Sequence, residues 1–426
     1  MKSLLYLPLI WAALIPSGWG FIVPEVDSAR PFSGHYHATD YQENYRPQFH
    51  FSPRNGWMND INALWYVDGI YHMTYQWGTN KRDAGYTSST DLLHWNDHGL
   101  ALIGRSSHAR DAGAKQNVSG DQIYSGSGIV ISGPVAAKIT GSPKPALITF
   151  YTGTKVGTCI AWSNDHGQTW HNYEKNPVAH PTTGDTPRDP CVIWHEATKK
   201  WVLAIYEEGT TFYGSKDLIT WKRLSNLRFG FECPDLVELP LDGDPEKMKW
   251  VLYDAAGKYL VGHFDGTHFF DENKSKEDLF MDLGPDFYAG QTFFPQTMPV
   301  KKYIQLAWMD EWNGGIDEKP WERNATFPVE LGLVTRDGKM RVTRTPIATI
   351  EKLYTGCTVR ITKQNLNHEN ILNEVRSKAF DMTVSFDLKG ATADEIVFEI
   401  ARLKYRYNIA DQKLMYQGVQ KNKFGS

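Results

Sequence analysis

Three acidic residues occur in similar local settings at distant points of the sequence. Asp60 directly precedes an alternating apolar segment and a turn at Asp68-Gly69. Asp189, within Arg188-Asp189-Pro190, and Glu232, within Glu232-Cys233-Pro234, are likewise followed by a strand-turn-strand pattern. Strands that begin around one common axis would bring these carboxylates together in a single funnel.

When carboxyl groups lie close together, one can stay protonated and act as an acid while another is ionised and acts as a nucleophile. Because like charges repel, at least one acid of the three should have a raised pKa. One ionised and one protonated carboxyl group near neutral pH is what the cleavage of a glycosidic bond requires. Each acid alone also has a structural explanation, as a turn residue, as a partner of Arg188 or as part of a surface corner. The matched setting of all three favours the catalytic interpretation.

Internal repeats predict the elements that position these acids. Hairpin-like units begin near Asp60, Gly126, Pro190, Cys233 and Gln291. Ser-x-Asp…Trp patterns close the units at Ser89–Trp95, Ser163–Trp170 and Ser215–Trp221, with weaker versions at Gly262–Phe269 and Leu333–Val342. Four strands per unit at a spacing of roughly 40 to 65 residues is typical of propeller blades. The sequence therefore predicts an all-β fold with a five-bladed β-propeller over residues 45–345. The repeated closing pattern argues against a sandwich whose hairpins resemble one another by chance. Long helical periodicity is absent, which argues against an α/β barrel.

The two ends of the chain differ from the repeats. Residues 1–20 read as a secretory signal peptide, with Lys2, an apolar core over Leu4–Ile15 and small residues at 18–20. Residues 21–44 form an N-terminal lead segment. The strict alternation of Phe380–Leu388 predicts a strand with one buried face. Residues 346–426 are therefore expected to form a short, truncated β-sandwich domain.

Composition excludes several classes of function. The net charge of −4 gives no reason to expect nucleic acid or a membrane surface as a partner. The aromatic content of 13% suits both a sugar-stacking pocket and an all-β core. A secreted location is predicted, and the sequons predict N-glycans at Asn117, Asn273 and Asn324.

The four cysteines predict neither a metal site nor a nucleophile. Cys159, Cys191, Cys233 and Cys357 match no metal-ligand spacing and leave three disulfide pairings open. Cys191 and Cys233 lie beside the candidate acids, where buried apolar packing is the favoured interpretation. No metal and no organic cofactor is expected.

The motifs around the acids resemble those of glycoside hydrolase family 32, the invertase, inulinase and levanase group. The family's Trp-Met-Asn-Asp-Pro-Asn-Gly stands here as Trp57–Ala63, its Phe-Ser-Gly-Ser as Tyr124–Ser127, and its Arg-Asp-Pro and Glu-Cys-Pro around Asp189 and Glu232. Tyr75-Gln76, Ser163–Trp170 and Asp286–Thr292 are also similar. These matches run in family order over most of the predicted propeller.

The resemblance implies a secreted, retaining glycosidase that releases terminal β-D-fructofuranosyl units from sucrose, inulin or levan. Asp60 would be the nucleophile, Glu232 the acid/base, and Asp189 with Arg188 would bind fructose hydroxyls. The same resemblance implies that four further residues line the fructose pocket: Trp57, Asn59, Gln76 and Ser125. It also implies the five-bladed propeller followed by a β-sandwich.

Departures from the family pattern leave two other interpretations open. Ile61 replaces the usual Pro, Ala63 the usual Gly, and Ala84 stands where the family has Trp. The missing Trp predicts a different leaving-group subsite or a different substrate. A fructosyltransferase would use the same covalent intermediate on the same scaffold. A catalytically impaired, secreted fructan-binding protein is the second alternative. The motifs of a related propeller family that cleaves arabinans and xylans differ from those here.

Overall fold

The computed structural model divides the chain into two compact units. One comprises residues 20–350, and the other comprises residues 351–426 together with residues 1–19. Within them, the structure describes residues 12–14, 41, 43, 46–47, 49–78, 82–107, 115–179, 186–293, 298, 301–309, 320–354, 357–362, 372–373, 375–376, 380–400 and 403–417. Most of the predicted signal peptide and of the lead segment lies outside the described residues. In the described part, no helix is both long and apolar enough to span a bilayer.

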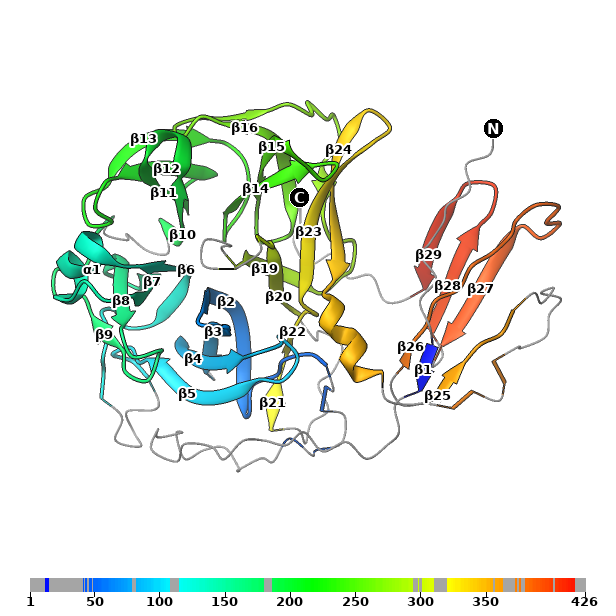
Figure 1. Ribbon diagram of the computed structural model, residues 1–426, viewed down its shortest axis with the longest axis horizontal. Coiled ribbons are helices and arrows are strands. Elements are labelled where there is room, and N and C mark those ends of the chain that lie inside the picture. Colours follow the sequence, from blue (N-terminus) through cyan, green and yellow to red (C-terminus); the bar gives the residue numbers. More distant parts are fainter. Residues whose placement is uncertain are drawn as a thin grey trace. The chain divides into compact units, whose positions relative to one another are not determined.

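The larger unit is a five-bladed β-propeller, as predicted (Figure 1). The first blade consists of β2 (Gly56–Val67), β3 (Ile70–Gly78), β4 (Arg82–Ser89) and β5 (Asn96–Leu102). The second consists of β6 (Ile123–Ile131), β7 (Ala146–Gly153), β8 (Gly157–Ser163) and β9 (His171–Asn172). The third consists of β10 (Arg188–His195), β11 (Lys200–Tyr206), β12 (Thr210–Ser215) and β13 (Lys222–Leu227).

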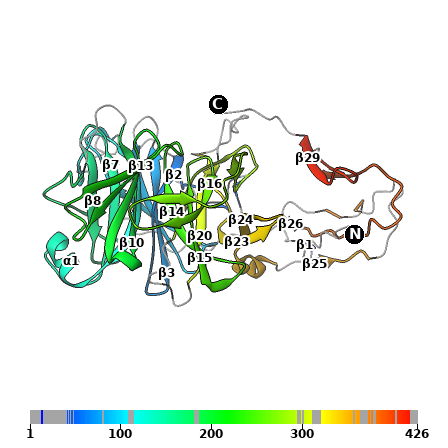
Figure 2. The ribbon, with the colours of Figure 1, turned by 90° about the horizontal axis from the view of Figure 1, so that it is seen from above.

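The last two blades share one continuous sheet because β14 and β23 pair in parallel at Leu241 and Leu333. The fourth contains β14 (Asp235–Leu241), β15 (Asp244–Tyr253), β16 (Lys258–Phe264), β17 (Phe269–Asp271) and β18 (Leu279–Phe280). The fifth contains β19 (Phe287–Thr292), β20 (Ile304–Met309), β22 (Asn324–Ala325), β23 (Val329–Arg336) and β24 (Lys339–Pro346). Helix α1 (Gly133–Thr140) lies at the outer edge of the second blade (Figure 1 and Figure 2).

A short strand closes the ring. β21 (Trp321–Glu322) pairs in parallel with the start of β2, with Gly56 opposite Trp321 and Trp57 opposite Glu322. The Gly56 amide also donates to the Pro320 carbonyl at 2.9 Å. A segment from the end of the propeller sequence thus fastens the innermost strand of the first blade.

The core lies between neighbouring blades. One cluster between the first two blades includes Trp65, Tyr86 and Tyr151, and equivalent clusters fill the next interfaces. Because both faces of a blade are covered, the middle strands are buried throughout, as in β7, where all eight residues are buried. This explains why these strands read as continuous apolar runs rather than as alternating ones.

The repeated Ser-x-Asp…Trp pattern forms the same turn in different blades. The Asp91 carboxylate accepts the amides of Leu93 and His94, both at 2.9 Å. In the third blade, the Asp217 carboxylate accepts the equivalent amides at 3.1 and 2.9 Å. In both turns the Trp indole donates to the backbone carbonyl three residues before it. The repeat therefore encodes a side-chain-capped turn that ends the third strand of a blade.

The smaller unit contains two three-stranded antiparallel sheets. One is formed by β25 (Cys357–Val359), β1 (Ala12–Leu14) and β26 (Phe380–Asp381). The other is formed by β27 (Glu395–Ile400), β28 (Leu403–Asn408) and β29 (Lys413–Gln417). The strand predicted over Phe380–Leu388 is shorter than expected, because only its first two residues find a ladder partner among the described strands.

The asparagines of the three sequons are less accessible than the sequence suggested. Asn117 and Asn273 donate their side-chain amides to the carbonyls of Ala101 and Met340, at 2.7 and 2.9 Å. Asn324 is only 8% exposed. A glycan attaches to this same amide nitrogen. The N-glycans predicted at these asparagines stay a prediction.

Candidate active site

Irregularities at the starts of the innermost strands direct side chains into the centre of the ring. The ladder shifts register beside Asp60 in β2, beside Ser125 in β6, beside Asp189 in β10 and beside Tyr288 in β19. Such bulges bend a strand and re-aim its side chains, and they are common next to active sites. The backbone of β6 approaches that of β7 closely at Gly126. Only glycine fits there, since a Cβ would lie 1.7 Å from the Phe150 carbonyl oxygen.

Two of the candidate acids also have strained backbone. The φ angles of Asp189 and Glu232 are 62° and 58°, and that of Cys233 is 40°. Residues with a Cβ seldom adopt this left-handed conformation, and those that do cluster at functional sites. The loop before β14 thus turns Glu232 toward the centre in a way that its sequence alone would not favour.

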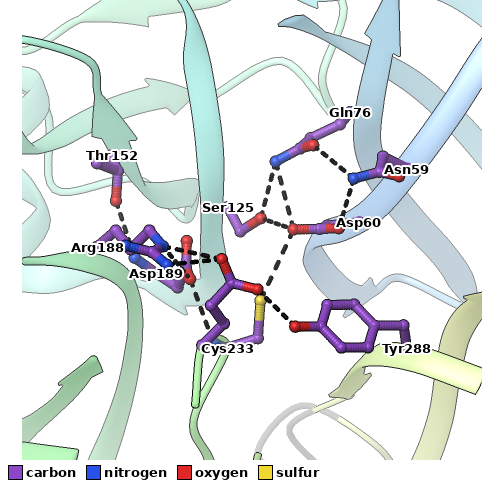
Figure 3. Close-up of polar contacts among 10 residues, drawn as sticks. Asn59, Asp60, Gln76, Ser125, Thr152, Arg188, Asp189, Cys233 and Tyr288 are labelled. Carbon is purple, nitrogen blue, oxygen red and sulfur yellow. Dashed lines mark hydrogen bonds and ion pairs between the residues drawn. The ribbon is translucent and has the colours of Figure 1, made fainter. Parts of the chain in front are cut away.

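Asp60 lies at the base of the site and is surrounded by hydrogen-bond donors (Figure 3). One carboxylate oxygen accepts Asn59 Nδ2 at 3.0 Å. The other accepts Ser125 Oγ and, at 3.4 Å, Gln76 Nε2. Gln76 also donates to Ser125 Oγ at 2.9 Å. Burial raises the pKa of Asp60, and the hydrogen bond from Ser125 opposes that rise.

Glu232 is held at both carboxylate oxygens. Arg188 Nη2 and Nε donate to Oε1 at 2.7 and 3.1 Å, and Tyr288 Oη donates to Oε2 at 2.5 Å. Arg188 comes from β10 of the third blade and Tyr288 from β19 of the fifth, so these two blades fix a carboxylate that lies between the third and fourth. This leaves Glu232 little rotational freedom.

Asp189 completes the group of acids. Its carboxylate accepts the Cys233 amide at 3.2 Å and lies 3.6 Å from Arg188 Nε. Burial, followed by repulsion from Asp60 and Glu232, raises the pKa of Asp189 to about 7, against the attraction of Arg188. Repulsion between the acids, which the sequence suggested as the reason for a raised pKa, is here the second cause after burial.

The structure brings the sequence-predicted site residues together. Seven of them are linked by hydrogen bonds, some through Cys233, and by the ion pair of Arg188 with Asp189: Asn59, Asp60, Gln76, Ser125, Arg188, Asp189 and Glu232. Trp57 joins them through Arg323, whose guanidinium lies 5.6 Å from its ring and donates to Asn59 Oδ1 at 2.6 Å. That bond points Asn59 Nδ2 toward Asp60.

Two contacts of this site were missed in the sequence. Tyr288 falls within the Asp286–Thr292 run, which resembles the family, but nothing local indicates that its hydroxyl reaches Glu232. Arg323 follows β21 and reaches Asn59 across 264 positions of sequence. Both contacts join segments that are far apart in the sequence and that meet at the centre of the ring.

The cysteines behave as buried thiols. Cys159, Cys191 and Cys233 are free, and burial raises the pKa of each thiol. Cys233 Sγ lies 3.7 Å from an Asp60 carboxylate oxygen. A neutral thiol is a poor nucleophile, so the prediction that Cys191 and Cys233 are packing residues agrees with their surroundings. Among the described residues, no cluster of His, Cys, Asp or Glu could hold a metal ion.

The departures from the family motifs lie in packed regions. Ala63 and Ala84 are both fully buried in the cluster between the first and second blades, and Ile61 is also fully buried. Ala84 is thus a packing residue between two blades. That the missing Trp changes the leaving-group subsite or the substrate stays a prediction.

Comparison with known proteins places this fold and site in a family. Residues 50–346 match the N-terminal domain of glycosyl hydrolases family 32. A levanase from Bacillus subtilis is 33% identical over 400 residues, which cover 84% of this chain and 55% of the levanase. Invertase 1 from Saccharomyces cerevisiae is 32% identical over 324 residues, which cover 68% of this chain and 58% of the invertase.

A solved structure agrees with these similarities. The exo-inulinase from Aspergillus awamori superposes with a TM-score of 0.61 at 29% identity, covering 72% of this chain and 68% of the inulinase. The chain belongs to glycosyl hydrolase family 32. It spans little more than half the length of the levanase and the invertase.

Proposed function

We propose that the protein is a retaining β-fructofuranosidase that releases terminal fructose from sucrose or fructans. The observation that carries this proposal is the contrast between two facing carboxylates. Asp60 is surrounded by neutral donors, whereas Glu232 is fixed by Arg188 and Tyr288 at separate oxygens. Both carboxylates are thus held in place by donors from other strands, and they differ in the kind of donor that each one accepts.

In the first step, an Asp60 oxygen attacks the anomeric carbon while the bond to the leaving group breaks. Glu232 gives its proton to the leaving oxygen, and a fructosyl ester on Asp60 results. In the second step, Glu232 takes a proton from water, and the water oxygen replaces Asp60 at the anomeric carbon. Two inversions give net retention, a course that requires carboxyl groups about 5–5.5 Å apart.

Asp189 and Arg188 are proposed to bind fructose hydroxyls. A buried carboxylate that does no covalent chemistry can accept hydrogen bonds from the hydroxyl groups and stabilise positive charge at the anomeric centre. Asn59, Gln76, Ser125 and Trp57 would complete the pocket around the sugar. The names of the levanase, invertase and inulinase relatives support levan, sucrose and inulin as candidate substrates.

Fructose release from sucrose, inulin and levan, measured side by side with the purified chain, tests the proposed function. Release from at least one substrate is expected, and the anomeric form of the first product, followed by NMR, should be β. An α product would contradict retention. A folded protein that releases no fructose would contradict the hydrolase proposal and favour the fructan-binding alternative.

Transfer to another sugar is the alternative that shares the covalent intermediate. Product analysis at high sucrose separates the two: oligosaccharides longer than sucrose indicate transfer, and free fructose in equal amount to glucose indicates hydrolysis. The enclosed Asp60 fits both reactions, because water and a sugar hydroxyl attack the same ester.

Secretion is proposed from Lys2 and the apolar segment that follows it. Extracellular inulinases among the relatives support this location. N-glycans at Asn117, Asn273 and Asn324 remain a prediction that mass spectrometry of the secreted protein would test.

Replacing Tyr288 by Phe is expected to lower kcat by about ten- to a hundredfold with little change in KM. The variant removes the hydrogen bond to Glu232 Oε2 and so leaves that carboxylate fixed at one oxygen only. Steady-state kinetics on sucrose or inulin measures the effect. Tyr213→Phe is the matched control, because Tyr213 also donates to a glutamate, Glu207, at 2.9 Å but on β12. Equal losses in both variants would contradict a role for Tyr288 in catalysis.

A further inference from the structure

A large aromatic side chain is exposed directly beside the proposed acid/base. Phe231 precedes Glu232 in the sequence and is 49% exposed, whereas most phenylalanines of the propeller are buried. An exposed apolar side chain at the edge of a polar site is typical of a ligand-binding surface. Phe231 has no role in the two steps proposed above.

The Phe231 backbone is held in place. Its amide donates to Asp254 Oδ2 at 3.2 Å, and the carbonyl of Glu232 accepts the Ala255 amide at 3.1 Å. Gly230 has a φ of 82°, and a Cβ there would lie 3.1 Å from Asp254. The loop is thus anchored on the turn after β15, and the exposed ring is presented by a fixed backbone.

The Phe231 ring belongs to a small aromatic surface. It meets Tyr206 edge to face, with ring centroids 5.1 Å apart and an interplanar angle of 69°. The Arg188 guanidinium lies 4.8 Å from the Tyr206 centroid and 5.7 Å from the Phe231 centroid. The same guanidinium donates to Glu232 Oε1 at 2.7 Å. One arginine therefore spans the distance from the aromatic pair to the acid/base.

The aromatic pair of Phe231 and Tyr206 lies on the side of the site where the leaving group of the substrate is expected. The acid/base must contact the oxygen that departs, so the sugar beyond that oxygen lies on the Glu232 side of the site. A sugar ring has a face of C–H groups that packs against an aromatic ring, while its hydroxyls need polar partners or water. The Phe231–Tyr206 pair offers such an apolar face, and Arg188 lies next to it as a donor.

We propose that Phe231 and Tyr206 form a leaving-group subsite that binds the sugar ring next to the scissile bond. The proposal rests on the proposed function of the same site. The pair would favour substrates whose leaving group contains a sugar ring over substrates with a small alcohol in its place. Phe231 would then be a specificity-determining residue that acts mainly through substrate affinity.

Hydrolysis of 1-kestose and of methyl β-D-fructofuranoside by Phe231→Ala and by the unmodified protein tests the subsite. The methyl compound has the same fructosyl group but no ring in its leaving group. The ratio of kcat/KM for kestose to kcat/KM for the methyl compound is expected to fall about tenfold in Phe231→Ala, mainly through KM. Phe231→Tyr, which keeps the ring, should restore the ratio to within about twofold of the unmodified protein.

Phe270→Ala provides the matched control. Phe270 is 51% exposed and packs against His263 and His268 in the fourth blade, so its loss removes a similar exposed ring elsewhere. An unchanged ratio in Phe231→Ala, or an equal loss on both substrates, would overturn the subsite and assign Phe231 to supporting Glu232. Should Phe231→Ala not fold, Tyr206→Ala is expected to lower the same ratio. An unmodified protein that releases no fructose from either compound would instead contradict the proposed function.

Discussion

Replacement of Asp60 by Asn is expected to lower kcat for fructose release by about four orders of magnitude or more, because no covalent intermediate can form. The amide keeps the shape of the carboxylate, and the donors Ser125, Asn59 and Gln76 remain in place. Substrate binding should therefore survive. Single-turnover kinetics together with a binding measurement would separate the loss of chemistry from a loss of affinity.

Glu232→Gln provides the comparison that distinguishes the two roles. A glutamine cannot protonate a leaving oxygen, so the loss should be large on sucrose and much smaller on a fructoside with an activated aryl leaving group. Asp60→Asn should be inactive on both. The control is Asp217→Asn, which alters a turn carboxylate of the third blade. Near-normal fructose release by Asp60→Asn or by Glu232→Gln would refute the assigned roles.

The second large effect is on stability. Asp189 has a pKa of about 7 in the folded protein against 3.8 for an ordinary Asp. Between these values the folded state binds more protons than the unfolded state, so this group makes stability fall as the pH rises. Above the folded pKa the cost reaches about 4 kcal/mol at most. Asp189→Asn has no charge to bury and is expected to be more stable than the unmodified protein at pH 8.

Unfolding midpoints in urea, followed by tryptophan fluorescence from pH 4 to pH 8, would measure this effect. The gain from Asp189→Asn should be largest at high pH and should shrink as the pH falls toward the ordinary range of an Asp. Activity should be lost at the same time, since the asparagine cannot supply a charge to the sugar. A variant that is less stable at pH 8, or a difference that does not depend on pH, would contradict this account.

Much of the fold could be predicted because each blade repeats its own local chemistry. The Asp91 and Asp217 turns have the same bonds, and their sequence pattern therefore marks blade ends. The candidate acids could be predicted for a related reason. Asp60 and Asp189 stand at equivalent strand starts, and Glu232 stands just before β14, so a periodic pattern aligns all three at the centre.

The remaining parts of the site depend on contacts between blades, and such contacts do not appear as a repeated pattern in the sequence. Arg323, which follows β21, bonds to Asn59 of the first blade, and Tyr288 of the fifth blade bonds to Glu232 between the third and fourth. The exposure of Phe231 follows from a loop anchored on Asp254. The burial of Ala84 could not be predicted for the same reason, since its strand position does not reveal that it faces the neighbouring blade.

The parallel pairing of β21 with β2 couples the timing of activity to the completion of the chain. All three acids precede residue 240, yet the strand that carries Asp60 is fastened by Trp321 and Glu322, and the next residue orients Asn59 toward it. During synthesis, all three carboxylates would be present in the polypeptide before the residues that complete the active site were added. The protein would remain latent during its own synthesis and would become competent only when the last blade docks against the first.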